Sequence, residues 1–360
     1  MLDSSDAAEW ESWVKEVGWH VIALAPDTHA NIDTRVQAVE RAAFDAIQNG
    51  SADPSQIYLA GRGESSAAVF YAISRVPDLW AAAVASGGSP QPAIDSGRLY
   101  AANFTNVPML WIGAGPNDLT VAEKLRSMGV PLESRSAERA QISSILEWLG
   151  RHTRPEYPAA IDCETNSPTF ARCYWIRMTK FDPGERNDVL DSTRVEPNKS
   201  ASLDLGGFGF QTDAPGPGVL VSFLPEKYSG PLKMGDRIVA LDGREITDGR
   251  RYVELMSQII EERPAAVTVQ RGKERMRVET RVVLPQRPAS VTARVQAQYL
   301  PAEKEVQIVS RTVTEMRVTI PPQWVPSVLN WNGVALEKIE TPGCRLLTIE
   351  KALQKVGSCP

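Results

Sequence analysis

Histidine and cysteine, the usual zinc ligands, are rare in this chain of 360 residues. Its three histidines, His20, His29 and His152, are far apart in the sequence, and its four cysteines form no Cys-x-x-Cys pair. A zinc site draws several ligands from such residues, usually at short spacing. There is also no Gly-x-x-x-x-Gly-Lys-Ser/Thr loop for a nucleotide phosphate. The sequence therefore predicts neither a metal site nor a cofactor.

The turn after the apolar run 56–60 is the best place to look for a nucleophile. It reads Gly61-Arg62-Gly63-Glu64-Ser65-Ser66 and precedes a predicted helix. Small residues permit the strained strand-to-helix turn that exposes a nucleophilic side chain. The turn includes Gly63, and a glycine has no side chain to form an acyl intermediate. Ser65 and Ser66 fall in the first helical turn, where serine is favoured as a cap.

The cysteines form two local pairs, Cys163 with Cys173 and Cys344 with Cys359. Four cysteines allow three pairings, and we favour the local one because it closes short loops within single segments. Four reduced cysteines are the alternative. Disulfides persist only in oxidising compartments. The start of the chain is polar and acidic, unlike a signal peptide. We therefore expect a periplasmic or extracellular protein if the natural chain begins upstream, and a cytoplasmic one otherwise.

Helical and apolar runs alternate over residues 1–155. Strands are predicted at 19–25, 56–60, 81–85 and 108–113, and helices at 8–17, 34–49, 66–75, 122–128 and 139–151. Continuous apolar strands separated by amphipathic helices are typical of βαβ units on a parallel sheet. Any chemistry is then expected at the carboxyl ends of the strands.

The turn around Gly63 and the following Pro77-Asp78-Leu79-Trp80 and Ser86-Gly87-Gly88 resemble the α/β-hydrolases, particularly esterase and polyhydroxyalkanoate-depolymerase-like members. The resemblance implies a Gly-x-Ser-x-Gly elbow in which Gly63 occupies the nucleophile position and Ser65 replaces the last glycine. It places the acid at Asp118, which equally fits a turn residue or helix cap. It places the histidine near 132–139, where none occurs.

The same resemblance implies further strands and an oxyanion loop before the first predicted helix. We therefore expect a truncated hydrolase-like sheet: either the natural chain begins further upstream, or something outside this sequence covers the exposed strand edge. His152 follows the last predicted helix and is expected to be a cation at its C-terminus rather than a catalytic base.

Residues 200–287 resemble a PDZ domain. The marks are Gly206-Gly207-Phe208-Gly209-Phe210, then Gly235-Asp236-Arg237-Ile238, then Asp242-Gly243. Strands are predicted at 219–223, 266–271 and 275–284, and a helix at 250–262. The resemblance implies that loop N–H groups bind a peptide's terminal carboxylate while the peptide adds as a strand.

The residues expected to form this peptide site are Gly207, Phe208, Gly209, Phe210, Tyr252 and Met256. The last two are expected to line the groove because they lie at i, i+4 on the predicted helix. The alternative for Phe208, Phe210, Tyr252 and Met256 is a place in the core.

The segments on either side of the PDZ-like region are β-rich. Strands are predicted at 171–178, 291–298, 305–310, 315–320 and 344–349, with linkers at 180–199 and 285–290. The joint at 152–158 resembles one that leads from esterase-like domains into a small β-sandwich in some secreted proteins. We therefore expect a sandwich made of 156–181 and 288–360, with the PDZ-like domain inserted. A separate third domain without residues 159–180 is the alternative.

Composition excludes some classes of partner. The net charge of −5 argues against nucleic acid, and no run approaches the roughly 20 apolar residues of a membrane span. The predicted fold is thus multidomain: a hydrolase-like α/β sheet, a PDZ-like domain and a small β-sandwich. We expect a peptide-binding protein whose hydrolase-like domain is a scaffold. The alternatives are a serine hydrolase with a non-standard or incomplete site, and a PDZ-like domain that acts only as a spacer.

Overall fold

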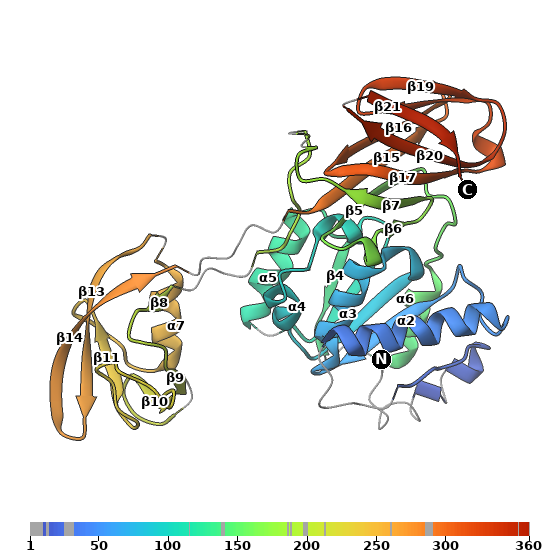
Figure 1. Cartoon of the computed structure of the whole chain (residues 1–360). Helices are drawn as coiled ribbons and strands as arrows, with labels where there is room; N and C mark the ends of the chain where they lie inside the picture. The colour runs from blue at the N-terminus through green and yellow to red at the C-terminus, as the bar shows by residue number, and fades with distance from the viewer. Residues whose placement is uncertain are drawn as a thin grey trace. The chain divides into compact units, whose positions relative to one another are not determined.

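The computed structural model describes residues 10–11, 14–24, 32–114, 116–137, 141–185, 187, 189–196, 201–211, 214–259, 261–284, 291–351 and 353–359. The chain divides into two compact units. Unit 1 is Met1–Val195 together with Ser290–Pro360, and unit 2 is Glu196–Ala289 (Figure 1). The protein is therefore multidomain, and each unit is described by itself. No helix in the described residues is long and apolar enough to cross a bilayer.

A parallel sheet organises the first part of unit 1. Its strands run in the order β1-β2-β3-β4 and are β1 (Tyr58–Arg62), β2 (Ala82–Ser86), β3 (Met109–Ile112) and β4 (Leu132–Arg135). Each neighbouring pair is parallel, which confirms the predicted parallel sheet. The helices are α2 (Ile32–Gln48), α3 (Ser65–Arg75), α4 (Gln91–Asp95), α5 (Pro116–Ser127) and α6 (Ile142–Gly150), with short 3-10 turns η1 (Pro77–Leu79) and η2 (Ala101–Phe104).

Both faces of this sheet are buried. On one face Ala83, Met109 and Trp111 pack into a core with α2, α3 and α5. On the other face the alternate residues Val84 and Leu110 pack against α6. Burial on two faces explains why the strands are apolar throughout instead of alternating.

The predicted strand at 19–25 is wrong where it can be compared. Residues 19–24 form no strand, and residue 25 lies outside the described residues. The helix predicted at 8–17 is helical at 10–11 and 14–16. Residues 8, 9, 12 and 13 lie outside the described residues. An apolar run becomes a strand only where a neighbouring strand supplies hydrogen bonds, and sequence composition does not show this.

The second part of unit 1 contains two five-stranded sheets, in the orders β19-β18-β16-β15-β5 and β21-β20-β17-β7-β6. The strands are β5 (Ala160–Thr165), β6 (Arg172–Cys173), β7 (Ile176–Phe181), β15 (Ala293–Leu300), β16 (Glu305–Arg311), β17 (Val313–Ile320), β18 (Ser327–Trp331), β19 (Val334–Ile339), β20 (Gly343–Glu350) and β21 (Leu353–Ser358), with 3-10 turns η4 (Pro168–Phe170) and η5 (Pro322–Trp324). One hydrophobic core takes residues from both sheets.

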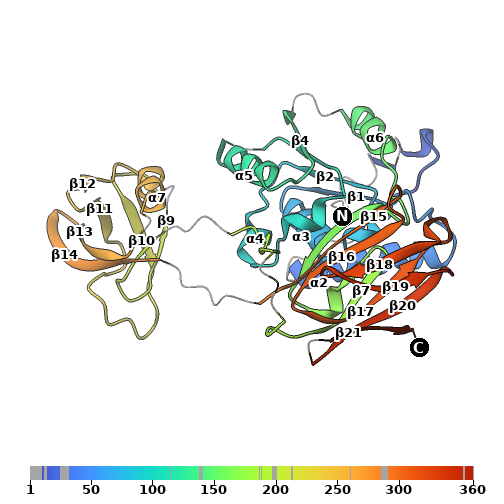
Figure 2. The ribbon, with the colours of Figure 1, turned by 90° about the horizontal axis from the view of Figure 1, so that it is seen from above.

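Strands from before and after unit 2 share these sheets. β5 pairs antiparallel with β15, and β7 pairs antiparallel with β17. Figure 2 shows green β7 lying among the orange and red strands of the C-terminal part. Disulfides join Cys163 to Cys173 and Cys344 to Cys359, which confirms the two local pairs.

A buried carboxylate forms hydrogen bonds with both chain segments that flank unit 2. Glu164 on β5 is fully buried. It accepts hydrogen bonds from the Ser192 hydroxyl at 2.6 Å and the Thr193 N–H at 2.6 Å, and also from the Thr292 hydroxyl. Arg311 Nη2 lies 3.6 Å away and balances its charge. Residues 192–193 lead into unit 2 and residue 292 follows it, so Glu164 fixes both segments at one place.

Unit 2 is a sheet with one helix. Its strands are β8 (Ser202–Leu203), β9 (Gly209–Gln211), β10 (Val219–Phe223), β11 (Arg237–Leu241), β12 (Arg244–Glu245), β13 (Arg263–Arg271) and β14 (Glu274–Val283), and its helix is α7 (Gly249–Ser257). The order is β8-β14-β13-β11-β10-β9, with β12 paired to β11. Within the described residues β9 is therefore an edge strand.

Candidate functional site

The loop before β9 leaves backbone donors unused. Gly206 and Gly207 have φ values of +84° and +73°, in the left-handed region that favours glycine. The N–H groups of Gly207 and Phe208 meet no acceptor among the described residues. Gly207 is exposed and Phe208 is half-buried. Consecutive free amides in such a loop form a concave site for an anion.

Tyr228 supports this loop from beneath. Its hydroxyl donates to the Leu205 carbonyl at 2.6 Å and accepts from the Leu232 N–H at 3.2 Å. A Cβ on Gly206 would lie 3.1 Å from Cε2 of the tyrosine ring. Sequence reasoning missed Tyr228, because nothing in its local sequence distinguishes it from any other half-buried tyrosine.

The space between β9 and α7 is lined by aromatic rings. The Phe210 ring meets the Tyr252 ring edge-on, with centroids 5.0 Å apart, and the Phe208 ring is 5.9 Å from that of Phe210. Phe210 is 37% exposed, whereas Tyr252 and Met256 are only 4% and 2% exposed and belong to the hydrophobic core of unit 2. Tyr252 thus contacts the exposed Phe210 ring from within the core.

The start of α7 is fixed by a cap, and its tyrosine is neutral. Asp248 is the N-cap, and its side chain accepts a hydrogen bond from the Arg251 N–H at 2.9 Å. Burial raises the pKa of Tyr252 to about 12. The Tyr252 side chain is therefore uncharged at neutral pH, as its place in the apolar core of unit 2 requires.

The Gly-Asp-x-Ile sequence has a structural role. Asp236 is 1% exposed, and both its carboxylate oxygens are held by Arg271, through Nε at 2.8 Å and Nη2 at 2.7 Å. Asp236 also accepts from the Lys233 N–H at 2.7 Å. This ion pair links the β10–β11 connection to the end of β13, away from β9.

The turn that holds Gly63 is tight and buried on its inner side. Gly63 has a φ of +55°, and its N–H donates to the Ser86 carbonyl at 2.8 Å. A Cβ on Gly88 would clash with the Gly63 carbonyl oxygen. The N-cap of α3 is Glu64, without a side-chain cap bond, so the predicted serine cap is wrong. The buried Ser66 hydroxyl instead donates to the Ser86 carbonyl at 3.0 Å.

The residues around the expected acid form a hydroxyl–carboxylate pair. Asp118 lies in the first turn of α5, and its Oδ1 accepts a hydrogen bond from the Ser89 hydroxyl at 2.7 Å. Sequence reasoning missed Ser89, because the contact spans 29 residues. Ser89 thus binds Asp118 in the described structure, while Gly63 offers no side chain for nucleophilic chemistry.

The described histidines lie elsewhere. The ring of His152 packs edge-on against Trp148, with centroids 4.5 Å apart. Burial, the largest cause, lowers the pKa of His152, which disfavours the predicted helix-terminal cation. His20 lines the cavity described next. His29 lies outside the described residues.

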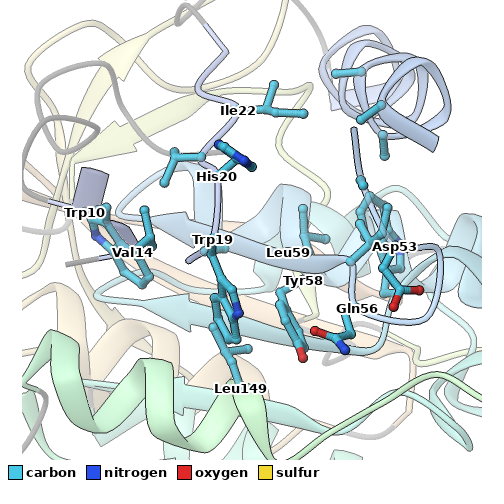
Figure 3. Close-up of a pocket in the computed structure, with 18 of the residues that line it drawn as sticks. Trp10, Val14, Trp19, His20, Ile22, Asp53, Gln56, Tyr58, Leu59 and Leu149 are labelled. Carbon is cyan, nitrogen blue, oxygen red and sulfur yellow. The ribbon is translucent and has the colours of Figure 1, made fainter. Parts of the chain in front are cut away.

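A cavity of about 450 Å³ lies beside β1. Figure 3 shows Trp19, Tyr58 and Leu149 on its walls. The Trp19 and Tyr58 rings stack with centroids 4.8 Å apart. These walls suit an apolar group better than an ion. Within the described residues, no cluster of three or more His, Cys, Asp or Glu side chains could hold a metal.

The model of the PDZ domain family matches residues 206–282. Residues 206–282 are a PDZ domain. This match confirms the resemblance seen in the sequence, and it covers the glycine loop, β9, α7 and the Asp236–Arg271 pair. No curated protein matches the chain.

Solved structures show limited similarity. The HtrA-type protease AlgW, solved with a decapeptide, is 22% identical over 24% of this chain and 31% of the protease, with a TM-score of 0.20. A variant of that protease, also with a decapeptide, gives the same identity and TM-score over 25% of this chain. A thermostable esterase is 16% identical over 34% of this chain and 37% of the esterase, with a TM-score of 0.27. The chain thus spans about a third of each.

Proposed function

We propose that the PDZ domain binds the carboxyl-terminal end of a peptide or protein in the groove between β9 and α7. The observation that carries the proposal is the loop beside the open edge of β9. The N–H groups of Gly207 and Phe208 are the donors for the terminal carboxylate, and Gly209 and Phe210 begin the strand that the peptide joins. Tyr252 and Met256 support the groove from the core.

The test compares peptides that differ only at the C-terminus. The full chain is titrated with a fluorescent C-terminal peptide library, and each peptide that binds is remade with an amidated end. We expect amidation to weaken binding about tenfold or more, because charge-assisted hydrogen bonds are lost. Equal affinity for the free and amidated ends would overturn the carboxylate site. No saturable binding by any peptide would favour the alternative that the PDZ domain acts only as a spacer.

A matched pair of glycine variants localises the site. Gly207 and Gly272 both have positive φ, +73° and +63°, and open space where a Cβ would stand. Alanine at either position costs about 1 kcal/mol of backbone strain. We expect Gly207→Ala to weaken peptide binding and Gly272→Ala, in the β13–β14 turn, to leave it unchanged. Equal weakening by both would indicate a loss of stability rather than of the site.

We further propose that residues 1–155 are a catalytically degenerate hydrolase-like scaffold. The lack of a side chain at Gly63 supports this, as does the pairing of Asp118 with Ser89. Hydrolysis of short-chain p-nitrophenyl esters should not exceed the buffer rate. Robust turnover that Ser65→Ala or Ser89→Ala abolishes would support the alternative of a serine hydrolase with a non-standard site.

We also propose that the chain comprises a hydrolase-like domain at 1–155, a β-sandwich of 156–181 and 288–360, and the inserted PDZ domain at 200–287. The two disulfides support an exported protein. Thiol labelling of the protein taken directly from its native cells tests this. Four reactive cysteines in the denatured, unreduced protein would contradict export.

A further inference from the structure

A second cavity of unit 1, of about 500 Å³, has polar walls. It is lined by residues of α2, α3, the stretch just before η2, and the stretch that follows β5. Two arginines, Arg75 and Arg98, and one carboxylate, Asp33, contribute charge to its lining. It lies within unit 1 and is distinct from the peptide groove and from the cavity of Figure 3.

The carboxylate in this cavity is fully engaged. Asp33 accepts hydrogen bonds from the Tyr71 hydroxyl at 2.7 Å, from Arg98 Nη1 at 2.9 Å and from Arg75 Nη1. Burial alone would raise the pKa of Asp33, but the Tyr71 hydrogen bond and the nearby arginines lower it. Glu40 lies 3.3 Å from Nε of Arg75 on its other side. The carboxylates of Asp33 and Glu40 are thus occupied by Arg75 and, in the case of Asp33, by Tyr71 and Nη1 of Arg98.

Arg98 has a second edge that is unused. Its guanidinium bonds run through Nη1 alone, to Asp33 and to the Tyr71 hydroxyl at 3.3 Å. Its Nε and Nη2 meet no acceptor in the described part of the chain, and its side chain is 47% exposed. Elsewhere in this molecule the Nε–Nη2 edge of Arg271 grips the carboxylate of Asp236 at 2.8 and 2.7 Å. That edge matches the two oxygens of a carboxylate or phosphate.

Two further lining residues have unused hydrogen-bonding groups. The Tyr100 hydroxyl is buried and has no partner among the described residues, which costs about 1–3 kcal/mol unless a partner is supplied. Asn166 is exposed, and its side-chain amide bonds no described residue. The unused groups include the N–H donors of Arg98, so the cavity as a whole favours a ligand rich in acceptors.

We propose that this cavity binds a small organic anion whose carboxylate or phosphate group sits on the Nε–Nη2 edge of Arg98. Asn166 and Tyr100 bind the remaining polar atoms of the ligand. A cavity of about 500 Å³ is larger than a bare ion requires and is of the size that holds a small molecule.

Calorimetric titration of the full chain at constant ionic strength tests the proposal. The probes are inorganic phosphate, succinate and, as a neutral polyol, glucose. We expect saturable binding of phosphate or succinate and none of glucose, and the preferred anion identifies the group. Arg98→Gln should weaken the binding about tenfold or more. Arg151→Gln is the control, because Arg151 is an exposed arginine at the C-cap of α6 that pairs with Glu147, and this variant should bind the anion as the parent does.

Asn166→Ala provides a second variant at an exposed position, so binding can be judged even if Arg98→Gln fails to fold. This variant should lower the affinity for the anion several-fold while the thermal unfolding temperature stays unchanged. Three outcomes would overturn the proposal: no saturable binding of phosphate or succinate, glucose binding as tightly as the anions, or Arg151→Gln weakening binding as much as the cavity variants.

Discussion

Asp236 shows how one residue stabilises the PDZ domain without being part of the proposed peptide site. Its buried carboxylate belongs to the Gly-Asp-x-Ile sequence that marks the PDZ resemblance, and it is held by Arg271. Burial alone would raise the pKa of Asp236, but the hydrogen bonds from Arg271 and the Lys233 N–H lower it. The charged form is therefore favoured in the folded state, and ionisation stabilises the PDZ domain.

Asp236→Asn should lower the free energy of unfolding of the PDZ domain by about 2 kcal/mol at neutral pH, because charge-assisted hydrogen bonds to Arg271 are lost. A group whose pKa is depressed on folding stabilises fully above its unfolded value, near pH 4 for aspartate. The difference between parent and variant should therefore shrink as pH falls through the lower folded pKa. Urea unfolding across a pH series measures it, and a difference undiminished at low pH would contradict the ionic origin.

Sequence patterns predict residues whose role is local. The glycines at 206 and 207 are recognisable because a left-handed backbone restricts the residue type. Contacts between distant residues left no such mark: Tyr228 beneath the loop and Ser89 on Asp118 were both missed. The i, i+4 spacing of Tyr252 and Met256 predicts a shared helix face, but it does not say that this face packs into the core.

At the scale of elements, the α/β part was predictable where strands have partners. The predicted strand 81–85 corresponds to β2 and 108–113 contains β3, and both are covered on two faces. The run at 19–24 is as apolar as these strands, yet it forms none. The pairing of β5 with β15 depends on residues 128 or more positions apart, so composition could predict the strands but not their register.

The elements that flank unit 2 depend on Glu164. Glu164→Ala removes the acceptor for Ser192, Thr193 and Thr292 and leaves the buried Thr292 hydroxyl without it. We expect the free energy of unfolding of unit 1 to fall by about 3 kcal/mol, since a buried charged partner is lost. Hydrogen exchange should rise at residues 192–193 and 292 before it rises in β16. An equal increase in hydrogen exchange across all of unit 1 would contradict the view that Glu164 stabilises only these segments.

At the scale of the whole molecule, the two units differ in covalent reinforcement. Both disulfides lie in unit 1, and unit 2 contains no cysteine. Each closes a short loop, with sequence separations of 10 and 15. Such crosslinks restrict the unfolded chain and typically contribute about 2–4 kcal/mol each.

Reduction should therefore lower the unfolding temperature of unit 1 and leave that of the PDZ domain unchanged. Scanning calorimetry with and without reductant measures both transitions, and the isolated segment 196–289 identifies the PDZ transition. A shift of both transitions by the same amount would mean that the two units unfold as one.

The hydrogen bonds of Glu164 affect which domains can be inserted between the two segments of unit 1. Glu164 holds together the two segments of unit 1 between which unit 2 is inserted. The entropic cost of closing an inserted segment rises only with the logarithm of its length. Exchanging the 94 residues of Glu196–Ala289 for a short Gly-Ser connection, or for another module with neighbouring termini, thus changes little in the closure cost. Unit 1 can therefore accept different inserted binding domains in place of unit 2. The stability of unit 1 and the binding specificity of the inserted domain can then vary independently.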